Sequence, residues 1–121
     1  DRLRAALAET EDHLILPVPA ENSRPSWFGF LITCKEGVDR NRVVQYVEDH
    51  GVQTRMLFAG NLTKHPCFDE MRAEKKGYRI VGELKNTDRI MTDTFWVGVY
   101  PGMTDEKIDY MAKVIKEGLL Q

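Results

Sequence analysis

Apolar residues along this chain recur with two different periods. Between Ser26 and Cys34 they occupy every second position from Phe28 onward, which predicts a half-buried β-strand. The segments Val52–Phe58 and Thr94–Tyr100 are rich in β-branched and aromatic residues and predict two more strands. The pattern therefore predicts three strands, separated by segments of other character.

Helical spacing marks two longer segments and one short one. A helix is expected from Asp39 to His50, with an inward stripe of valines (Val43, Val44 and Val47). We interpret His50 as a helix-end residue and not as a catalytic one. Another helix should begin at Thr104, with apolar residues repeating from Ile108 to Leu119. A short helix capped by Asn86 or Thr87 is expected before the third strand.

This order of elements predicts an α+β fold with a small, mainly antiparallel three-stranded sheet and helices on one face. A right-handed crossover between the first two strands leaves room for Thr94–Tyr100 to pair antiparallel between them. From Ala59 to Leu84 the pattern predicts a long irregular connection, and we interpret the charge cluster Arg72–Lys76 within it as a solvated helix or loop face. Connections of this length are uncommon unless they line a site or an interface.

The start of the chain favours a helix without an N-terminal capping box. Its apolar side consists mainly of Leu3 and Leu7, too little for a helix to bury much surface alone. We therefore expect residues 1–12 to end a linker helix that continues upstream, and residues 13–121 to form one domain of a larger protein.

Composition narrows the function classes. The chain has 121 residues, 42% of them hydrophobic, and a net charge of −2. It has no basic stripe, spanning segment or signal sequence, so we expect no nucleic-acid or membrane partner and a cytoplasmic setting. Cys34 and Cys67 are too few for a metal cage and have no ligand-spaced neighbours, so no metal site is expected.

One segment has the character of a binding site. The strand that contains Arg55 runs into Gly60 and Asn61, so its guanidinium could meet a phosphate or carboxylate, although a solvated strand-end arginine is the alternative. His65 follows in the same connection. Trp27 belongs either to the core or to a face turned toward a partner domain. Because no nucleophile, phosphate-loop or metalloprotease motif occurs, we expect no catalytic residue in this chain.

Four segments resemble one family in order and spacing: residues 25–30, 53–61, 86–91 and 93–102. They are similar to the C-terminal domain of the nucleotide-sugar 3-dehydrases of the DegT/DnrJ/EryC1/StrS aminotransferase-like family. The resemblance covers the chain from about Glu11 onward. It implies the small-domain fold of fold-type I pyridoxal-phosphate enzymes.

The resemblance also implies a chemistry. The whole enzyme would bind pyridoxamine phosphate in an absent large domain and act on a CDP-linked 4-keto-6-deoxy sugar, toward the 3,6-dideoxy sugars of O-antigen in lipopolysaccharide. A histidine in that domain would replace the usual Schiff-base lysine. An iron–sulfur cluster there, an electron-donating reductase and a homodimer are further expectations. The small domain would close over the substrate, and the substrate-binding candidates here are Arg55, Asn61, Gly60, Trp27 and His65.

Two alternatives stay open. The chain could belong to a nucleotide-sugar aminotransferase of the same family, which uses a lysine and an amino donor. It could also be a stand-alone ferredoxin-like regulatory or interaction module, since the fold alone does not decide function. An excised domain should expose the apolar patch that once met its partner, whereas a stand-alone module should not.

Overall fold

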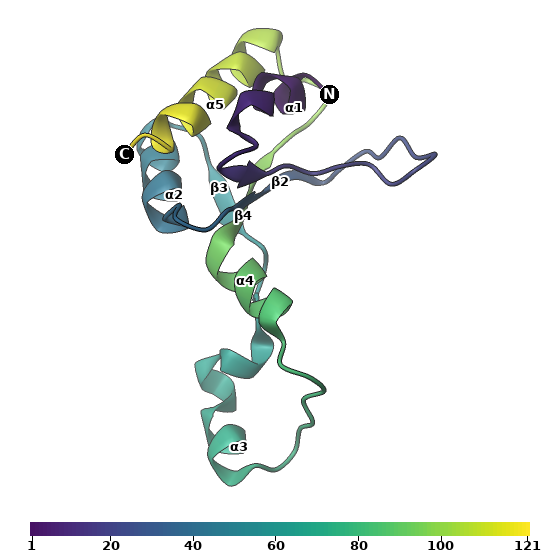
Figure 1. Cartoon of the computed structure of the whole chain (residues 1–121), viewed down its shortest axis with the longest axis vertical. Helices are drawn as coiled ribbons and strands as arrows, with labels where there is room; N and C mark the ends of the chain where they lie inside the picture. The colour runs from purple at the N-terminus through teal and green to yellow at the C-terminus, as the bar shows by residue number, and fades with distance from the viewer.

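A four-stranded antiparallel sheet organises the chain, and the computed structural model describes all 121 residues (Figure 1). The strands are β1 (Leu14–Ile15), β2 (Gly29–Cys34), β3 (Thr54–Met56) and β4 (Thr94–Gly98). Their order is β1-β2-β4-β3, so β4 lies between β2 and β3 and pairs antiparallel with both, as predicted. The α+β fold class is confirmed.

The prediction of three strands was wrong because β1 was missed. Leu14 and Ile15 pair with Cys34 and Thr33 along the free edge of β2. Two residues are too few to display a strand period, and only pairing with β2 reveals them. Phe28 was also wrongly placed on the core face. Pairing of β2 with β4 starts at Gly29, and the Phe28 side chain is 80% exposed.

Three helices cover one face of the sheet: α1 (Arg2–Ala6), α2 (Arg40–Asp49) and α5 (Asp105–Gly118). The helix caps agree with the predictions, since the Asp39 side chain accepts from Asn41 N and the Thr104 side chain accepts from Lys107 N. The core between these helices and the sheet consists of 16 buried residues, among them Leu7, Ile32, Val47, Phe95 and Ile115. The apolar stripes of α2 and α5 thus face the sheet as expected.

The first helix belongs to this core. Leu3 and Leu7 are both buried, and the Arg2 guanidinium forms ion pairs with Asp105 and Asp109 of α5 at 2.9 and 2.7 Å. The Arg2 contact lowers the pKa of the Asp109 carboxyl below its usual value, chiefly through a hydrogen bond. The N-terminal segment is therefore held against the last helix, at the outer side of the domain.

Two segments extend away from the sheet (Figure 1). Residues 17–28, between β1 and β2, form an extended arm whose backbone turns near Asn22, at φ 59°. The other, from Ala59 to Leu84, is here called the lobe. It contains two 3₁₀ turns, η2 (Leu62–Lys64) and η3 (Pro66–Phe68), and the helix α3 (Asp69–Glu74), so the expected irregular connection is partly helical and the charge cluster begins on a helix.

Helix α4 (Lys85–Asp93) leads from the lobe back to β4. The predicted cap at Asn86 or Thr87 was wrong, because the N-cap position is held by Leu84, two residues before Asn86. Leu84 has a left-handed backbone, φ 52°, and no side-chain cap. The left-handed turn of the backbone at Leu84, and not a capping side chain, precedes the first turn of this helix.

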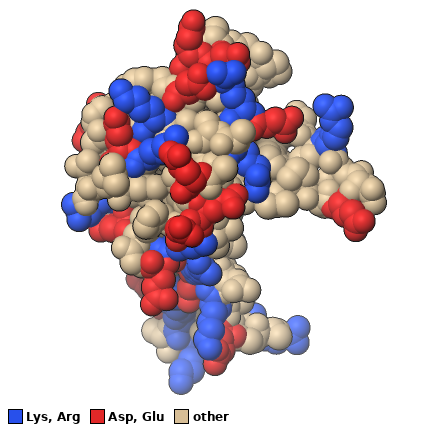
Figure 2. Space-filling model, turned by 45° about the horizontal axis from the view of Figure 1, so that its top comes forward, with Lys and Arg blue, Asp and Glu red and all other residues tan.

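The surface has no block of one charge on the face shown in Figure 2, where acidic and basic side chains are interspersed. No helix combines the length and the apolar character needed to cross a bilayer.

Candidate functional site

The uncovered face of the sheet carries aromatic side chains and one arginine. A shallow concavity of about 300 Å³ on this face is lined by Trp27, Phe28, Phe58 and Trp96, together with Pro17, Gly29, Leu31 and Leu57. Phe28 packs on Trp96 with ring centroids 5.2 Å apart. Aromatic groups exposed together on a sheet face are unusual unless something covers them.

Arg55 lies on the same face, because it is the cross-strand partner of Trp96. Its Nη1 donates to the carbonyl of Thr54 at 2.7 Å, but no carboxylate lies within ion-pair distance. The strand beneath it is fixed by Glu48, whose Oε1 accepts from the Thr54 amide at 3.2 Å and from the Thr54 hydroxyl at 2.5 Å. These hydrogen bonds lower the pKa of the Glu48 carboxyl. The positive charge of Arg55 contributes to the same lowering of the Glu48 pKa. Arg55 is therefore an anchored, exposed guanidinium that forms no ion pair.

Trp27 contacts both the core and the open face of the sheet. It is half-buried and contacts Phe30 of the core edge to face, at 6.4 Å and 75° between rings. It also lines the aromatic concavity. Trp27 and Arg55 thus lie on the same open face of the sheet. Trp27 lines the concavity, and Arg55 lies beside it on β3.

Gly60 lies where the chain enters the lobe, pressed against α4. Its φ is +60°, and a Cβ there would stand 2.5 Å from Met91 Cγ and 3.0 Å from Met91 Cα. Only glycine combines this backbone conformation with so close an approach. Its role in the structure is to let the lobe leave the sheet beside α4.

Asn61 is a buried hydrogen-bonding node, 2% exposed. Its amide donates to Asp88 Oδ1 at 2.7 Å, and its Oδ1 accepts from the amide and hydroxyl of Thr63 at 3.0 and 2.6 Å. Lys64 Nζ also pairs with Asp88, at 2.8 Å. Since these partners occupy the Asn61 side chain, its proposed contact with a sugar or nucleotide stays a prediction, and its observed contacts hold the lobe.

His65 closes the same turn. Its Nε2 lies 2.5 Å from the carbonyl of Ala59, and Arg72 donates to the carbonyls of Thr63 and His65 at 2.5 and 3.0 Å. Gly60, Asn61 and His65 are thus brought together at the base of the lobe, whereas Arg55 and Trp27 lie on the sheet. The structure divides the five candidates into these two groups.

Sequence reasoning missed Arg72 and Asp88. Arg72 was interpreted as part of a solvated charge cluster, yet it organises the turn at His65. Asp88 binds Asn61 and Lys64 of the lobe, while Arg89 forms a local pair on the helix with Asp93 at 3.8 Å. The Lys64 hydrogen bond, and then that of Asn61, lower the pKa of the Asp88 carboxyl. Partners so far apart in sequence leave no local signal.

Neither cysteine has the setting of a metal ligand or nucleophile. Cys34 is buried, and burial raises the pKa of its thiol to about 11, while Cys67 is exposed. No cluster of three or more His, Cys, Asp or Glu side chains could hold a metal ion.

Residues 1–116 match the DegT/DnrJ/EryC1/StrS aminotransferase family. The chain belongs to this family. The resemblance recognised in the four segments is thereby confirmed over nearly the whole sequence.

Two curated family members are similar along almost all of the chain. The lipopolysaccharide biosynthesis protein RfbH of Salmonella typhimurium is 47% identical over 117 residues, which cover 95% of this chain and 26% of that protein. The dTDP-4-dehydro-2,6-dideoxy-D-glucose 3-dehydratase of Saccharopolyspora spinosa is 46% identical over 118 residues, 96% of this chain and 24% of that protein. The chain thus spans about a quarter of the length of these relatives.

A solved structure of a GDP-4-keto-6-deoxymannose-3-dehydratase with a trapped PLP-glutamate geminal diamine has the same fold. It matches with a TM-score of 0.69 and 25% identity, over 94% of this chain and 29% of that chain. The small-domain fold expected from the resemblance to fold-type I enzymes is confirmed, with four strands in place of three.

Proposed function

We propose that this chain is the C-terminal domain of a nucleotide-sugar 3-dehydrase that removes the 3-hydroxyl of a 4-keto-6-deoxy sugar. Near-half identity to a sugar 3-dehydratase along almost the whole chain carries this proposal. The substrate that we propose is CDP-linked and leads to the 3,6-dideoxy sugars of O-antigen. The similarity to a lipopolysaccharide biosynthesis protein supports that assignment.

The role of this domain is to cover the substrate. Its helices occupy one face of the sheet, and the opposite face presents the aromatic concavity and Arg55. Against the remainder of a longer protein, that face would bury its aromatic groups and exclude water from the reacting sugar. Arg55, which forms no ion pair, would donate two parallel hydrogen bonds to a phosphate or carboxylate.

The cofactor is assigned to the remainder of the longer protein. Of the two candidates on the open face, Trp27 and Arg55, only Arg55 is a cation, and one guanidinium does not form a phosphate cradle. Bound pyridoxamine phosphate supplies the electron-withdrawing ring needed for loss of a sugar hydroxyl. An iron–sulfur cluster, an upstream histidine base, an electron-donating reductase and a homodimer complete the proposal.

The residues at the base of the lobe would fix the position of the lobe relative to the sheet. Asp88 and Asn61 hold the lobe on α4, and Gly60 allows the close contact with Met91. The three residues would thereby set where the lobe and His65 lie relative to the open face. In this arrangement Asn61 and Gly60 support substrate binding through geometry.

The test is the reaction of the longer protein that contains this chain. It should be incubated with pyridoxamine phosphate, a CDP-linked 4-keto-6-deoxy sugar, and a reductase together with the reduced electron donor that it oxidises, and the sugar product identified by NMR and mass spectrometry. Loss of the 3-hydroxyl is expected, without consumption of glutamate. Turnover of only dTDP- or GDP-linked sugars would reject the CDP assignment and keep the reaction class.

A sugar aminotransferase is the second candidate, favoured by the family to which the chain belongs. Formation of an amino sugar at the expense of glutamate, with no loss of oxygen, would establish it in place of the dehydrase. A stand-alone module is disfavoured by the exposed aromatic concavity. It would be supported if the chain occurred naturally alone and stayed monomeric at high concentration.

A further inference from the structure

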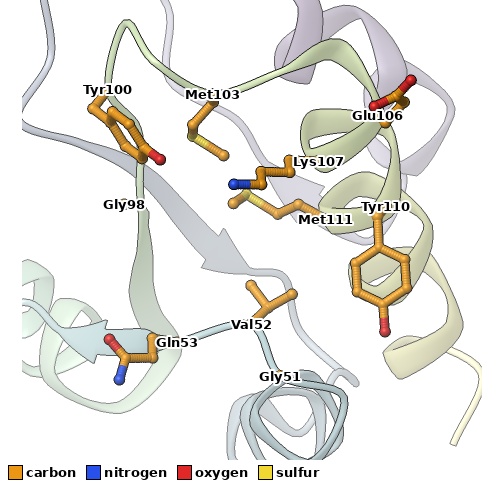
Figure 3. A pocket seen from close by; sticks show the side chains of 10 residues that line it. All are labelled: Gly51, Val52, Gln53, Gly98, Tyr100, Met103, Glu106, Lys107, Tyr110 and Met111. Carbon is orange, nitrogen blue, oxygen red and sulfur yellow. The ribbon is translucent and has the colours of Figure 1, made fainter.

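A second concave region lies away from the open face, between α5 and the ends of β3 and β4 (Figure 3). The cleft has a volume of about 550 Å³ and is lined by the segment that precedes β3, the end of β4 with the loop that follows it, and the first half of α5, but by no residue of the lobe. Its floor is apolar: Val52 and Met111 are 7% and 8% exposed, and Met103 lies beside them. Small-molecule sites have volumes of roughly 300 to 1,000 Å³.

One positive charge points into this cleft. Figure 3 shows the Lys107 ammonium and the Tyr100 hydroxyl directed toward one another across the cleft, while the Glu106 carboxylate points away. Lys107 forms no ion pair, in contrast with Lys113 of the same helix, which lies 3.8 Å from Glu117. Neither the Lys107 ammonium nor the Tyr100 hydroxyl has a hydrogen-bond partner in the protein.

The walls of the cleft are held in place before any ligand arrives. The Tyr110 hydroxyl donates to the carbonyl of His50 at 3.0 Å, which ties α5 to the end of α2. Thr104 caps the first turn of α5 by accepting from the Lys107 amide. A wall fixed in this way loses little conformational freedom when a ligand binds, which favours affinity.

The positive charge of Lys107 and the apolar floor of the cleft indicate which class of ligand it would bind. A single ammonium with one hydroxyl matches a single negative charge, whereas a phosphate dianion is usually bound by several cations or by a cluster of amides. The two methionines offer adaptable apolar contacts. We propose that this cleft binds a small organic carboxylate, whose anionic group accepts from Lys107 and Tyr100 and whose apolar part lies on Met103 and Met111.

This site is separate from the open face and does not rest on the proposed enzymatic function. The test uses this chain with phenylacetate as the probe and follows amide chemical shifts by NMR. Saturable shifts are expected around Met103, Lys107 and Met111, and phenylacetamide, which is uncharged, should bind about tenfold more weakly.

Variants separate the site from general charge effects. Lys107→Met should weaken phenylacetate about tenfold and Tyr100→Phe by a few-fold, because each removes a donor to the carboxylate. Lys113→Met on the same helix is the matched control and should leave affinity unchanged. Both tested side chains are exposed, so the variants should keep the dispersed spectrum of the folded chain.

Three results would overturn the proposal: equal binding of phenylacetamide, equal losses in the Lys107 and Lys113 variants, or shifts scattered over the surface. Tighter binding of phenyl phosphate than of phenylacetate would reject the carboxylate class. The same titration on the longer protein decides whether the cleft is open there, and absence of shifts in Lys107 would reject the site in that protein.

Discussion

The side chain of Asn61 donates to Asp88 across 27 positions of sequence, and this hydrogen bond of 2.7 Å joins the lobe to α4. Asn61 also caps the first turn of the lobe through Thr63. One buried amide thus takes part in the local turn and, beside the Lys64–Asp88 ion pair, in the attachment of the lobe to α4. A side chain placed in this way affects the position of the lobe more than the stability of the sheet.

Replacement of Asn61 by alanine should therefore loosen the lobe. Loss of a buried, charge-assisted hydrogen bond costs about 1 to 3 kcal/mol, so amide exchange between Ala59 and Leu84 should accelerate by roughly 5- to 150-fold. Exchange in β2 and β4 should hardly change. Asn86→Ala is the control, since Asn86 is exposed and its side chain makes no hydrogen bond. Unchanged exchange in the lobe would show that other contacts hold it.

Stability should depend on pH through Asp88. The folded protein lowers the pKa of this carboxyl from its usual value of 3.8, by the Lys64 and Asn61 hydrogen bonds. A carboxyl whose pKa is lower in the folded than in the unfolded state stabilises the fold at pH values above its unfolded-state pKa. This stabilisation is lost as the pH falls through the folded-state pKa. Asp88→Asn should then be less stable than the original chain near pH 6, with a gap that narrows below pH 3.8. Urea titrations at several pH values measure it, and a gap independent of pH would assign the loss to packing.

Gly29 and Gly98 are cross-strand partners with different surroundings, which provides a matched pair of substitutions. A Cβ on Gly29 would stand 2.4 Å from the Trp96 ring, whereas a Cβ on Gly98 would meet no atom within 4 Å. Gly29→Ala should destabilise the fold by about 1 to 3 kcal/mol and shift Trp96 fluorescence, because the ring must move. Gly98→Ala should do neither. Equal effects of the two substitutions would contradict the close packing of Trp96.

Arg55 can be tested in the longer protein. If its guanidinium forms two parallel bonds to the substrate, Arg55→Lys should lower kcat/KM for the nucleotide sugar by ~10- to 150-fold with little change in Tm. Arg79→Lys, an exposed arginine of the lobe, is the control. A Tm that falls together with activity would indicate a structural pair, and unchanged kcat/KM would remove Arg55 from the site.

The fold was largely readable because its main elements have strong local patterns. Asp39 and Thr104 cap helices whose apolar residues repeat at helical spacing, and both helices form as predicted. The two-residue β1 has no such pattern and depends on pairing with β2. The strand-to-loop context singled out Arg55 and Gly60, whose part in substrate binding stays a prediction. The roles of Asp88 and Arg72 were not recognisable from the sequence, because their partners are set by tertiary structure.

Met56 and Phe95 are opposite one another on β3 and β4. The backbone therefore leaves the sheet after Met56 and re-enters it at Thr94, and the lobe and α4 together form one excursion between these two neighbouring strands (Figure 1). Changes of length or sequence within such an excursion do not disturb the strand register beneath it. The sequence and length of the lobe can therefore change during evolution independently of the sheet, whose strand order and register stay the same.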